Sequence, residues 1–248
     1  MDTKPLISVI IPVRNGEKHI GEAIESVINQ QNNDFRTEII VVDDGSTDGT
    51  KNVVYRYCGF DPQSPEKTGD FCLCENDSVQ YFYQQASGAI VARNFGFEQT
   101  NGDFVLFHDA DDVLNADALQ TLYYQFVINQ KIQVALALRK DFYSPEMTEE
   151  ERQKLPLRAE GYGGAIAGCA LFRRSVFDTV GLFDENLRMA GDAMEFLLRL
   201  EKYNVKTLKI NYIAVSRRIH ANNMGRTSST EQHNDYAAVL RQKLFKKG

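Results

Sequence analysis

The chain has 248 residues, enough for one large α/β domain or two small ones, and its 43% hydrophobic content can fill a core. Its 34 acidic and 28 basic side chains give a net charge of -6, which argues against general binding to nucleic-acid phosphates. The early apolar run "PLISVIIPV" is too short to span a bilayer and lacks a signal-peptide layout, so we expect a cytoplasmic protein.

The four cysteines are Cys58, Cys72, Cys74 and Cys169. The pair Cys72 and Cys74 lacks the second pair that a structural zinc site would show. We therefore expect reduced thiols.

The first elements predict a βαβ unit. Residues 6–13, "LISVIIPV", are a continuous apolar and β-branched run, as in a parallel strand that is buried on both faces. Residues 15–30 have apolar side chains at helical spacing, with Glu17 and Glu22 early in the helix, where the dipole favours acids. A second buried strand follows and stops at Asp43. Such a unit predicts a parallel sheet with ligands at its carboxyl edge.

The same alternation continues to residue 112. A helix begins after residue 44, with Ser46 or Thr47 available as its cap, and residues 59–78 form a polar, turn-rich loop. Then "VQYFYQQ" predicts a strand, "GAIVARNFGFEQT" a helix, and "DFVLFHDADD" another buried strand. After the acids, "NADALQTLYYQFVINQ" predicts an amphipathic helix that packs on the core.

Polar residues follow the predicted strands where each one ends. Arg14 and Asn15 follow the first strand, Asp43 and Asp44 end the second, and residues 109–112 contain three acids. Because the carboxyl ends of parallel strands share one edge, we expect these side chains to form a single crevice, the predicted active site. Carboxylates gathered this closely repel one another unless a cation lies among them, and Mg²⁺ or Mn²⁺ suits oxygen ligands and substrate phosphates.

Four motifs carry a family resemblance. "IIPVRN", "VVDDGSTDGT", "GAIVARNFG" and "HDADD", in that order over about residues 6–115, resemble family two inverting nucleotide-sugar glycosyltransferases of the A-type fold. The resemblance implies a Rossmann-like, mostly parallel sheet flanked by helices, a nucleotide-diphosphate-sugar donor, and Mn²⁺ or Mg²⁺ as cofactor.

By position, the resemblance also implies roles for individual residues. It places Asp109 at the ribose and Asp111 on the metal, and these two acids have little structural use at the end of a buried strand. The other substrate-binding residues would line the nucleoside pocket (Pro12, Arg14, Asn15, Asp43, Asp44) or lie near the diphosphate (Arg93, Asn94).

Several of these residues also have a simpler interpretation. Asp48 and Ser46 are more readily explained as helix caps than as ligand contacts, and Asp112 as a supporting or capping group than as a metal ligand. Arg93 is as well explained by a structural ion pair as by a phosphate contact.

The second half carries a weaker resemblance to the acceptor-side segment of the family. In "GLFDENLRMAGDAMEFLLRL" the helix start would carry the catalytic base, which takes a proton from the acceptor hydroxyl. We predict Asp192, at the N-cap, as this base. Glu195 is the alternative base, because the chain lacks the usual acidic pair. A simpler interpretation is that Asp192 only caps the helix and has no catalytic role.

The segment "RRIHANNMGRT" resembles the C-terminal loop of the family. His220 would bind the metal or the diphosphate, unless it is an ordinary polar loop residue, and Arg218 or Arg226 would neutralise phosphate charge. Residues 141–164 should border the acceptor site. The last residues predict a helix whose Lys246 and Lys247 form a solvated tail or a weak contact with anionic lipid.

These patterns together predict one domain, 1–248, with a nucleotide-sugar-binding half, 1–115, and an acceptor-side half, 116–248. The predicted function is metal-dependent, inverting transfer of a sugar to a glycan or lipid-linked acceptor, and the predicted location is the cytoplasm, including the inner membrane face. A non-catalytic nucleotide-sugar-binding module and a nucleotidyltransferase are the alternatives. The altered motif at Asp192 favours the first of these, whereas "PVRNGEKHIG" only faintly resembles the glycine-rich loop of the second.

Overall fold

A computed structural model describes most of the chain. It covers residues 4–30, 33–58, 71–72, 79–158, 160–163, 166–187, 191–220 and 223. The predictions made for Cys74, Arg226, Lys246, Lys247 and the terminal helix lie outside these residues, as does most of the expected loop 59–78.

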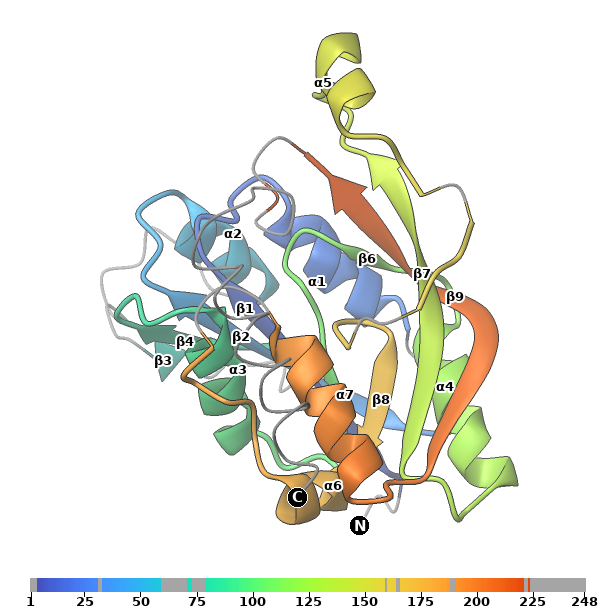
Figure 1. The fold of residues 1–248 in the computed structure, drawn as a ribbon. Coiled ribbons are helices and arrows are strands. Elements are labelled where there is room, and N and C mark those ends of the chain that lie inside the picture. The colour runs from blue at the N-terminus through green and yellow to red at the C-terminus, as the bar shows by residue number, and fades with distance from the viewer. Residues whose placement is uncertain are drawn as a thin grey trace.

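The described strands form one mixed sheet with helices on both faces (Figure 1). The strand order in this nine-stranded sheet is β3-β4-β2-β1-β5-β8-β7-β9-β6. The strands are β1 (Leu6–Val13), β2 (Arg36–Asp44), β3 (Phe71–Cys72), β4 (Val79–Gln84), β5 (Phe104–Phe107), β6 (Val113–Leu114), β7 (Val134–Tyr143), β8 (Ala170–Arg173) and β9 (Thr207–Ile219).

The helices confirm an α/β fold. The described helices are α1 (Ile20–Ile28), α2 (Thr50–Tyr57), α3 (Ala89–Glu98), α4 (Ala118–Ile128), α5 (Glu149–Lys154), α6 (Ser175–Val180) and α7 (Asp192–Lys202). The chain runs from β1 through α1 to β2 and then through α2 to β4, in the same direction across the sheet. Because such crossovers are right-handed, α1 and α2 lie on the same face. The chain then returns to β5 through α3, which therefore lies on the opposite face together with α7 (Figure 1). None of the helices in the described ranges is long and apolar enough to cross a membrane.

The central strands are buried on both faces, as their apolar sequences predict. All residues of β1 after Leu6 are buried, and β2 is buried from Glu38 onward. The close approach of α3 to these strands depends on Gly96, because a Cβ there would lie 2.5 Å from a methyl carbon of Ile10. An alanine at this position would therefore push α3 away from the sheet.

The direction of each strand decides which strands end at the carboxyl edge of the sheet. We call this edge the active edge, because the predicted active site lies there. Strands β1, β2, β4 and β5 are mutually parallel, and β8 runs antiparallel to both β5 and β7. Strand β7 therefore has the same direction as β5, and β9 is parallel to β7. The carboxyl ends of β7 and β9 consequently lie at the same edge as those of the donor-half strands. The sequence analysis did not predict these two strands.

Aromatic packing joins the two halves of the chain. Phe107, at the end of β5, contacts Phe172 of β8, Phe177 of α6 and Phe183, with ring centroids 4.9 to 6.5 Å apart. Phe196 of α7 is fully buried and packs against Phe172, Phe177 and Phe183. Burial of such rings stabilises the fold by roughly 2 kcal/mol each, and here it also fixes α7 beside the active edge.

The structure corrects several local predictions. Residues 217–219, expected to begin a loop, end β9, and residues 71–72 of the expected loop 59–78 form β3. Neither Ser46 nor Thr47 caps α2, whose N-cap is Gly49 without a side-chain bond, and Asp48 instead accepts a bond from the Thr50 amide (3.0 Å). Helix α1 begins at Ile20, so Glu17 precedes it. Strand β5 ends at Phe107, so the acids lie in the loop after it, as the strand-end pattern predicted. A further correction concerns Asp192: the N-cap of α7 is Gly191 (φ 85°), so Asp192 is the first helical residue and not the cap.

Candidate active site at the carboxyl edge of the sheet

The loop after β5 presents its acids in two different environments. The side chains of Asp109 and Asp111 are 33% and 34% exposed, whereas Asp112 is buried. Asp112 accepts a hydrogen bond from the amide of Arg218 (2.9 Å). Burial, with Asp111 and Asp109 nearby, raises the pKa of Asp112 well above its usual range. Asp112 therefore supports β9, in agreement with the supporting role expected from sequence, and the two exposed acids are available to a ligand.

Arg93 of α3 bridges the two halves of the chain. Its Nη2 donates to Asp109 Oδ1 (2.9 Å) and its Nη1 donates to Asp192 Oδ2 (2.6 Å). Burial acts to lower the pKa of Arg93, but Asp109 and then Asp192 outweigh it, and the pKa is raised. The guanidinium is thus a permanent cation between a predicted ribose ligand and the predicted base. The ion pair considered from sequence is present, and its partners belong to the predicted site.

Asp192 and Glu195 differ clearly in their surroundings. Asp192 starts α7 with its carboxylate on Arg93, whereas Glu195 is buried and forms an ion pair with Arg199 one turn later (2.7 Å). The Asp192 carboxylate therefore lies beside Asp109, and the Glu195 carboxylate is bonded within its own helix. This geometry favours Asp192 as the candidate base.

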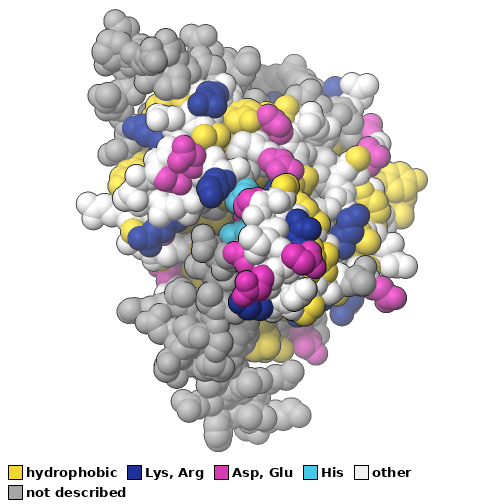
Figure 2. All heavy atoms as spheres, turned by 90° about the horizontal axis from the view of Figure 1, so that it is seen from above, with side chains coloured by type: hydrophobic (Ala, Val, Ile, Leu, Met, Phe, Trp, Pro, Cys, Tyr) yellow, Lys and Arg dark blue, Asp and Glu magenta, His cyan; other side chains and the backbone are white. Residues whose placement is uncertain are grey.

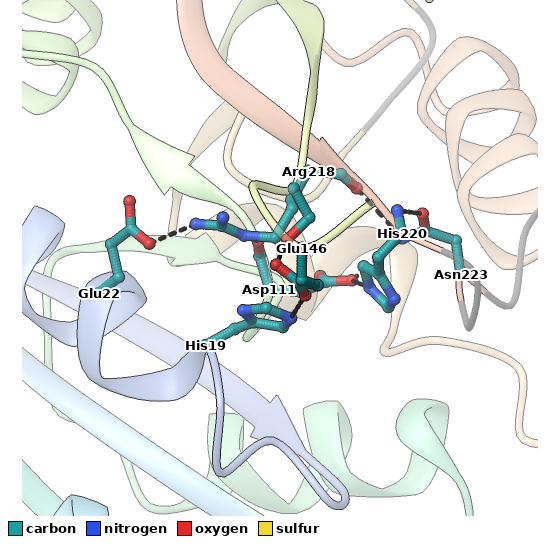
Figure 3. Close-up of polar contacts among 8 residues, drawn as sticks. His19, Glu22, Asp111, Glu146, Arg218, His220 and Asn223 are labelled. Carbon is teal, nitrogen blue, oxygen red and sulfur yellow. Dashed lines mark hydrogen bonds and ion pairs between the residues drawn. The ribbon is translucent and has the colours of Figure 1, made fainter. Parts of the chain in front are cut away.

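Asp111 meets the end of β9 (Figure 3). Its Oδ2 lies 3.0 Å from His220 Nε2 and accepts from Asn223 Nδ2 at 3.3 Å. The Asn223 side chain in turn accepts from the His220 amide at 2.6 Å, which closes the turn that carries the histidine. Burial alone would raise the pKa of Asp111, but the hydrogen bond and charge of His220 lower it. The structure therefore brings together the two residues predicted as metal ligands.

Sequence analysis missed two side chains of this group, His19 and Glu146. The His19 ring lies 5.4 Å from the His220 ring, and its Nε2 is 3.6 Å from Glu146 Oε1 (Figure 3). Burial, and then the charge of Arg218, lowers the pKa of His19. The rule that selected Arg14 and Asn15 could have found His19, because it also follows β1. Glu146 lies in residues 141–164, which carry no motif.

Arg218 is turned toward the protein. Its side chain is 4% exposed, and its guanidinium is bonded to Glu22 and to the carbonyl of Asp111 (3.0 Å for the second contact). The guanidinium also lies 4.7 Å from the ring centre of Phe142. Phosphate binding by Arg218 stays a prediction, and these contacts link α1, the acidic loop and β9.

Asp43, Asp44 and Asn94 are buried, and other groups of the protein occupy their polar atoms. Asp43 accepts from the Ser46 amide (2.8 Å) and the Tyr81 hydroxyl (2.8 Å). Asp44 accepts from Gln84 and from the amides of Ser87 and Gly88. Asn94 bonds both the amide and the carbonyl of Phe183. Their predicted substrate contacts remain untested, and their visible role is to hold loops at the edge.

The remaining predicted residues lie where β1 ends. Pro12 is buried opposite Val42 of β2, and Arg14 is exposed at the edge. Asn15 has a left-handed backbone (φ 52°), and its side chain accepts from the Thr47 amide at 2.9 Å. The predicted nucleoside residues therefore surround the ends of two adjacent strands.

The donor set at Asp111 fits a divalent ion of the predicted kind. One carboxylate oxygen and one imidazole nitrogen are suitable ligands for Mn²⁺, and substrate phosphates commonly supply the others. Among the described residues there is no group of three or more His, Cys, Asp or Glu side chains that could hold a metal by itself.

The described face of the molecule above this edge carries charges of both signs. Figure 2 shows histidine side chains reaching the surface next to acidic and basic ones. A mixed sheet whose parallel strands end at such an edge is typical of α/β proteins that bind ligands at the strand ends.

Comparison with known proteins identifies the family. The profile of "Glycosyl transferase family 2" matches residues 8–181. The chain belongs to this family. An uncharacterized glycosyltransferase of Rickettsia prowazekii is 28% identical over 98% of this chain and 73% of its own length. TuaG of Bacillus subtilis, provisionally named for teichuronic acid biosynthesis, is 37% identical over 47% of this chain and 40% of its own.

Solved structures share the fold. The chain matches a fragment of S. aureus TarS in complex with UDP-GlcNAc with a TM-score of 0.71 and 22% identity, over 95% of this chain and 64% of that one. GalNAc-T7 with UDP, GalNAc and Mn²⁺ gives a TM-score of 0.70 and 18% identity, over 97% of this chain and 48% of that one. The chain is thus shorter than these relatives, and the expectation of an A-type glycosyltransferase fold is confirmed.

Proposed function

We propose that this protein transfers a sugar from a nucleotide-diphosphate sugar to an acceptor hydroxyl, with inversion at the anomeric carbon. One observation carries the proposal: Asp192, Arg93 and Asp109 form a continuous chain of ion pairs from the acceptor half to the donor half. This contact supports a site shared by donor and acceptor, because one guanidinium bonds both the predicted base and the expected donor ligand.

The reaction assigns a task to each of these groups. The acceptor hydroxyl attacks the anomeric carbon while Asp192 takes its proton, and the bond from that carbon to the diphosphate breaks with its electron pair going to the diphosphate. Asp109 would bind the ribose. Arg93 holds both carboxylates in place at 2.9 and 2.6 Å, so it is a positioning residue for the base.

Divalent-ion dependence is part of the proposal, with Asp111 and His220 as protein ligands. When bound, Mn²⁺ or Mg²⁺ would offset the charge that builds on the departing diphosphate. Asn223 and the turn that it closes orient His220 toward Asp111, as supporting groups commonly orient metal ligands.

The names of relatives support a class of substrates. UDP and UDP-GlcNAc are bound in the TarS structures, and TuaG is named for synthesis of a cell-surface polymer. We propose a nucleotide-diphosphate-sugar donor and a glycan or lipid-linked acceptor for this chain as well. Its organisation as one domain with two halves, and its action at the inner membrane face, belong to the same proposal.

A donor screen tests the proposal. The protein would be incubated with a panel of nucleotide sugars and several acceptors, with Mn²⁺ or with a chelator, and followed by thermal shift and by release of nucleoside diphosphate. We expect a rise in melting temperature and turnover with at least one donor, both dependent on the metal. No stabilisation or turnover with any donor would contradict the proposal, and binding without turnover over many acceptors would favour a non-catalytic binding module.

A further inference from the structure

Three arginines surround one tyrosine on the second-half side of the site. The guanidinium carbon of Arg158 lies 4.4 Å from the ring centre of Tyr162, and that of Arg139 lies 5.0 Å from it. The tyrosine hydroxyl donates to Asp141, and Arg217 Nη1 is 3.9 Å from the same carboxylate. We call Arg139, Arg158, Arg217 and Tyr162 the arginine cluster.

The cluster lies at the active edge. Arg217 lies two residues before the end of β9, and Arg139 lies in the middle of β7, which shares its direction with β5. Strand β7 extends beyond the end of β5, because Leu136 pairs with Ala170 of β8 and Val105 of β5 pairs with Phe172 of the same strand, so Arg139 lies past the level of Phe107. Tyr162 pairs with Arg139 through two backbone hydrogen bonds, of 2.9 and 3.0 Å. Arg217 directly precedes Arg218, whose amide bonds Asp112, and its charge contributes to the lowered pKa of Asp111. The cluster is therefore adjacent to the acidic loop.

Sheet order separates the cluster from the predicted nucleoside pocket. That pocket is at the ends of β1 and β2, on one side of β5, whereas β7 and β9 lie on the other side beyond β8. Because neighbouring strands are about 4.8 Å apart, β7 lies roughly 10 Å from β5. A group bound by the cluster would thus approach the acidic loop from the side opposite the nucleoside.

The cluster has more positive charge than its visible contacts neutralise. Among the described residues, Asp141 is the acid that forms an ion pair with one of the three guanidinium groups, and Asp112 acts on Arg217 from a longer distance. The Nε atom of Arg139 is buried and has no hydrogen-bond partner in the part of the chain that is described, and Arg158 is exposed. One arginine would be enough to stack on Tyr162. The cluster has three, although the chain as a whole has a net charge of -6.

Arginine is suited to one type of ligand in particular. Its planar guanidinium binds carboxylate and phosphate groups through paired hydrogen bonds, and a stacked guanidinium keeps its edge open for them. An acceptor carrying such a group would be repelled by Asp109 and Asp111, so it needs local cations to approach Asp192. The cluster supplies them on the side of the site opposite the predicted nucleoside pocket.

We propose that the arginine cluster binds a carboxylate or phosphate group of the acceptor glycan, and that the enzyme therefore prefers anionic acceptors. This inference rests on the proposed glycosyltransferase function, because it assumes that the acceptor reaches Asp192 from the β7 side.

The test measures acceptor binding separately from turnover. UDP binding with Mn²⁺ is measured first by titration calorimetry. At saturating UDP, NMR titrations then compare glucuronate and glucose 6-phosphate with neutral glucose. We expect the wild-type protein to bind both anionic sugars about tenfold more tightly than glucose, and we expect added NaCl to weaken this preference.

Variants assign the preference to the cluster. R158Q alters an exposed side chain and should reduce the preference severalfold, and R139Q/R158Q should abolish it while leaving the UDP dissociation constant unchanged within about twofold. K140Q is the matched control. It removes one charge from the neighbouring exposed position, whose side chain points to the other face of the strand, and it should keep the preference.

Three results would overturn the inference: no preference in the wild-type protein, an undiminished preference in the variants, or weakened UDP binding in R158Q. The third would assign the cluster to the donor diphosphate. Should R139Q/R158Q fail to fold by circular dichroism, R158Q alone decides the question. Failure of the wild-type protein to bind UDP would count against the proposed function, whereas a lost preference with intact UDP binding would count against the cluster alone.

Discussion

The acids at the active edge fall into two groups that differ in what they bind. Asp43 and Asp44 are buried, and they accept hydrogen bonds from backbone amides in the loops after β2 and β4, and also from the Tyr81 hydroxyl and the Gln84 side-chain amide. Asp109, Asp111 and Asp192 are partly exposed and bond side-chain groups, the guanidinium of Arg93 and the imidazole of His220. Backbone partners cannot be exchanged without unfolding a loop, but side-chain partners can be. The first group therefore shapes the edge, and the second is able to accept a ligand.

The strongest test of this distinction is Asp192→Asn. We expect turnover to fall about a thousandfold, because the amide cannot take the proton, while UDP binding and the free energy of unfolding change little. Steady-state assays and titration calorimetry would check both parts. Glu195→Gln is the control, with turnover within severalfold of wild type. The opposite pattern would make Glu195 the base.

The counterpart in the buried group is Asp44→Ala. It leaves three donors without their acceptor, so we expect the free energy of unfolding to fall by about 3 kcal/mol and the melting temperature by about 6 to 12 °C. Chemical and thermal denaturation would measure this. Asp109→Ala should cost less than about 1 kcal/mol. Equal losses in the two variants would abolish the distinction between the groups.

His108 extends the comparison to a buried group without a described partner. Both of its ring nitrogens are buried and make no hydrogen bond within the described residues, and burial lowers its pKa from 6.5 to about 4. The unfolded chain therefore binds a proton near pH 6.5 that the folded protein refuses until about pH 4, so stability is lost as the pH falls through this window.

We expect this loss to reach about 2 kcal/mol at pH 5 relative to pH 8, and His108→Phe should remove it. Urea denaturation of both proteins across this range would measure the difference. The raised pKa of Asp112 acts in the opposite direction in both proteins, so the difference between them isolates His108. Parallel pH profiles would show that the imidazole does not titrate in this way.

The smallest expected effect is on donor affinity. Asp111→Ala should abolish the gain in UDP affinity that Mn²⁺ gives, a loss of about tenfold, and should change the free energy of unfolding by less than about 1 kcal/mol. Calorimetry with Mn²⁺ and with a chelator would measure it. Asp178→Ala on α6, an exposed acid away from the edge, should leave the gain intact. An unchanged gain in Asp111→Ala would remove the proposed metal role.

Local patterns were sufficient to predict the donor half of the fold. Continuous apolar runs identified β1, β2 and β5, because strands buried on both faces leave this signature. The end of β9 at Arg217 and Arg218 was read as a loop, because its buried and exposed positions follow no simple alternation and its pairing with β7 is distant in sequence. The direction of β7 and β9 depends on such distant pairing, which no local pattern contains.

The candidate site was predictable to a similar degree. The rule that polar residues at strand ends share one edge predicted that Asp109 and Asp111 lie together. The family resemblance added Asp192 and His220. Neither showed that Arg93 would bind both Asp109 and Asp192, because Arg93 and Asp192 are 99 residues apart in the sequence. The predicted cap of α2 was wrong, because the Ser46 hydroxyl accepts a hydrogen bond from the Asn15 amide. This tertiary contact replaces local capping.

The arginine shared by Asp109 and Asp192 has a consequence for protein engineering. A library that varies the pocket near Asp109 to accept a new nucleoside would also disturb the alignment of the attacking oxygen, since one guanidinium bonds both Asp109 and Asp192. Selections for altered donor choice should therefore be screened against several acceptors in parallel. Variants discarded for low activity with one acceptor would include some that had changed their acceptor and not lost their chemistry.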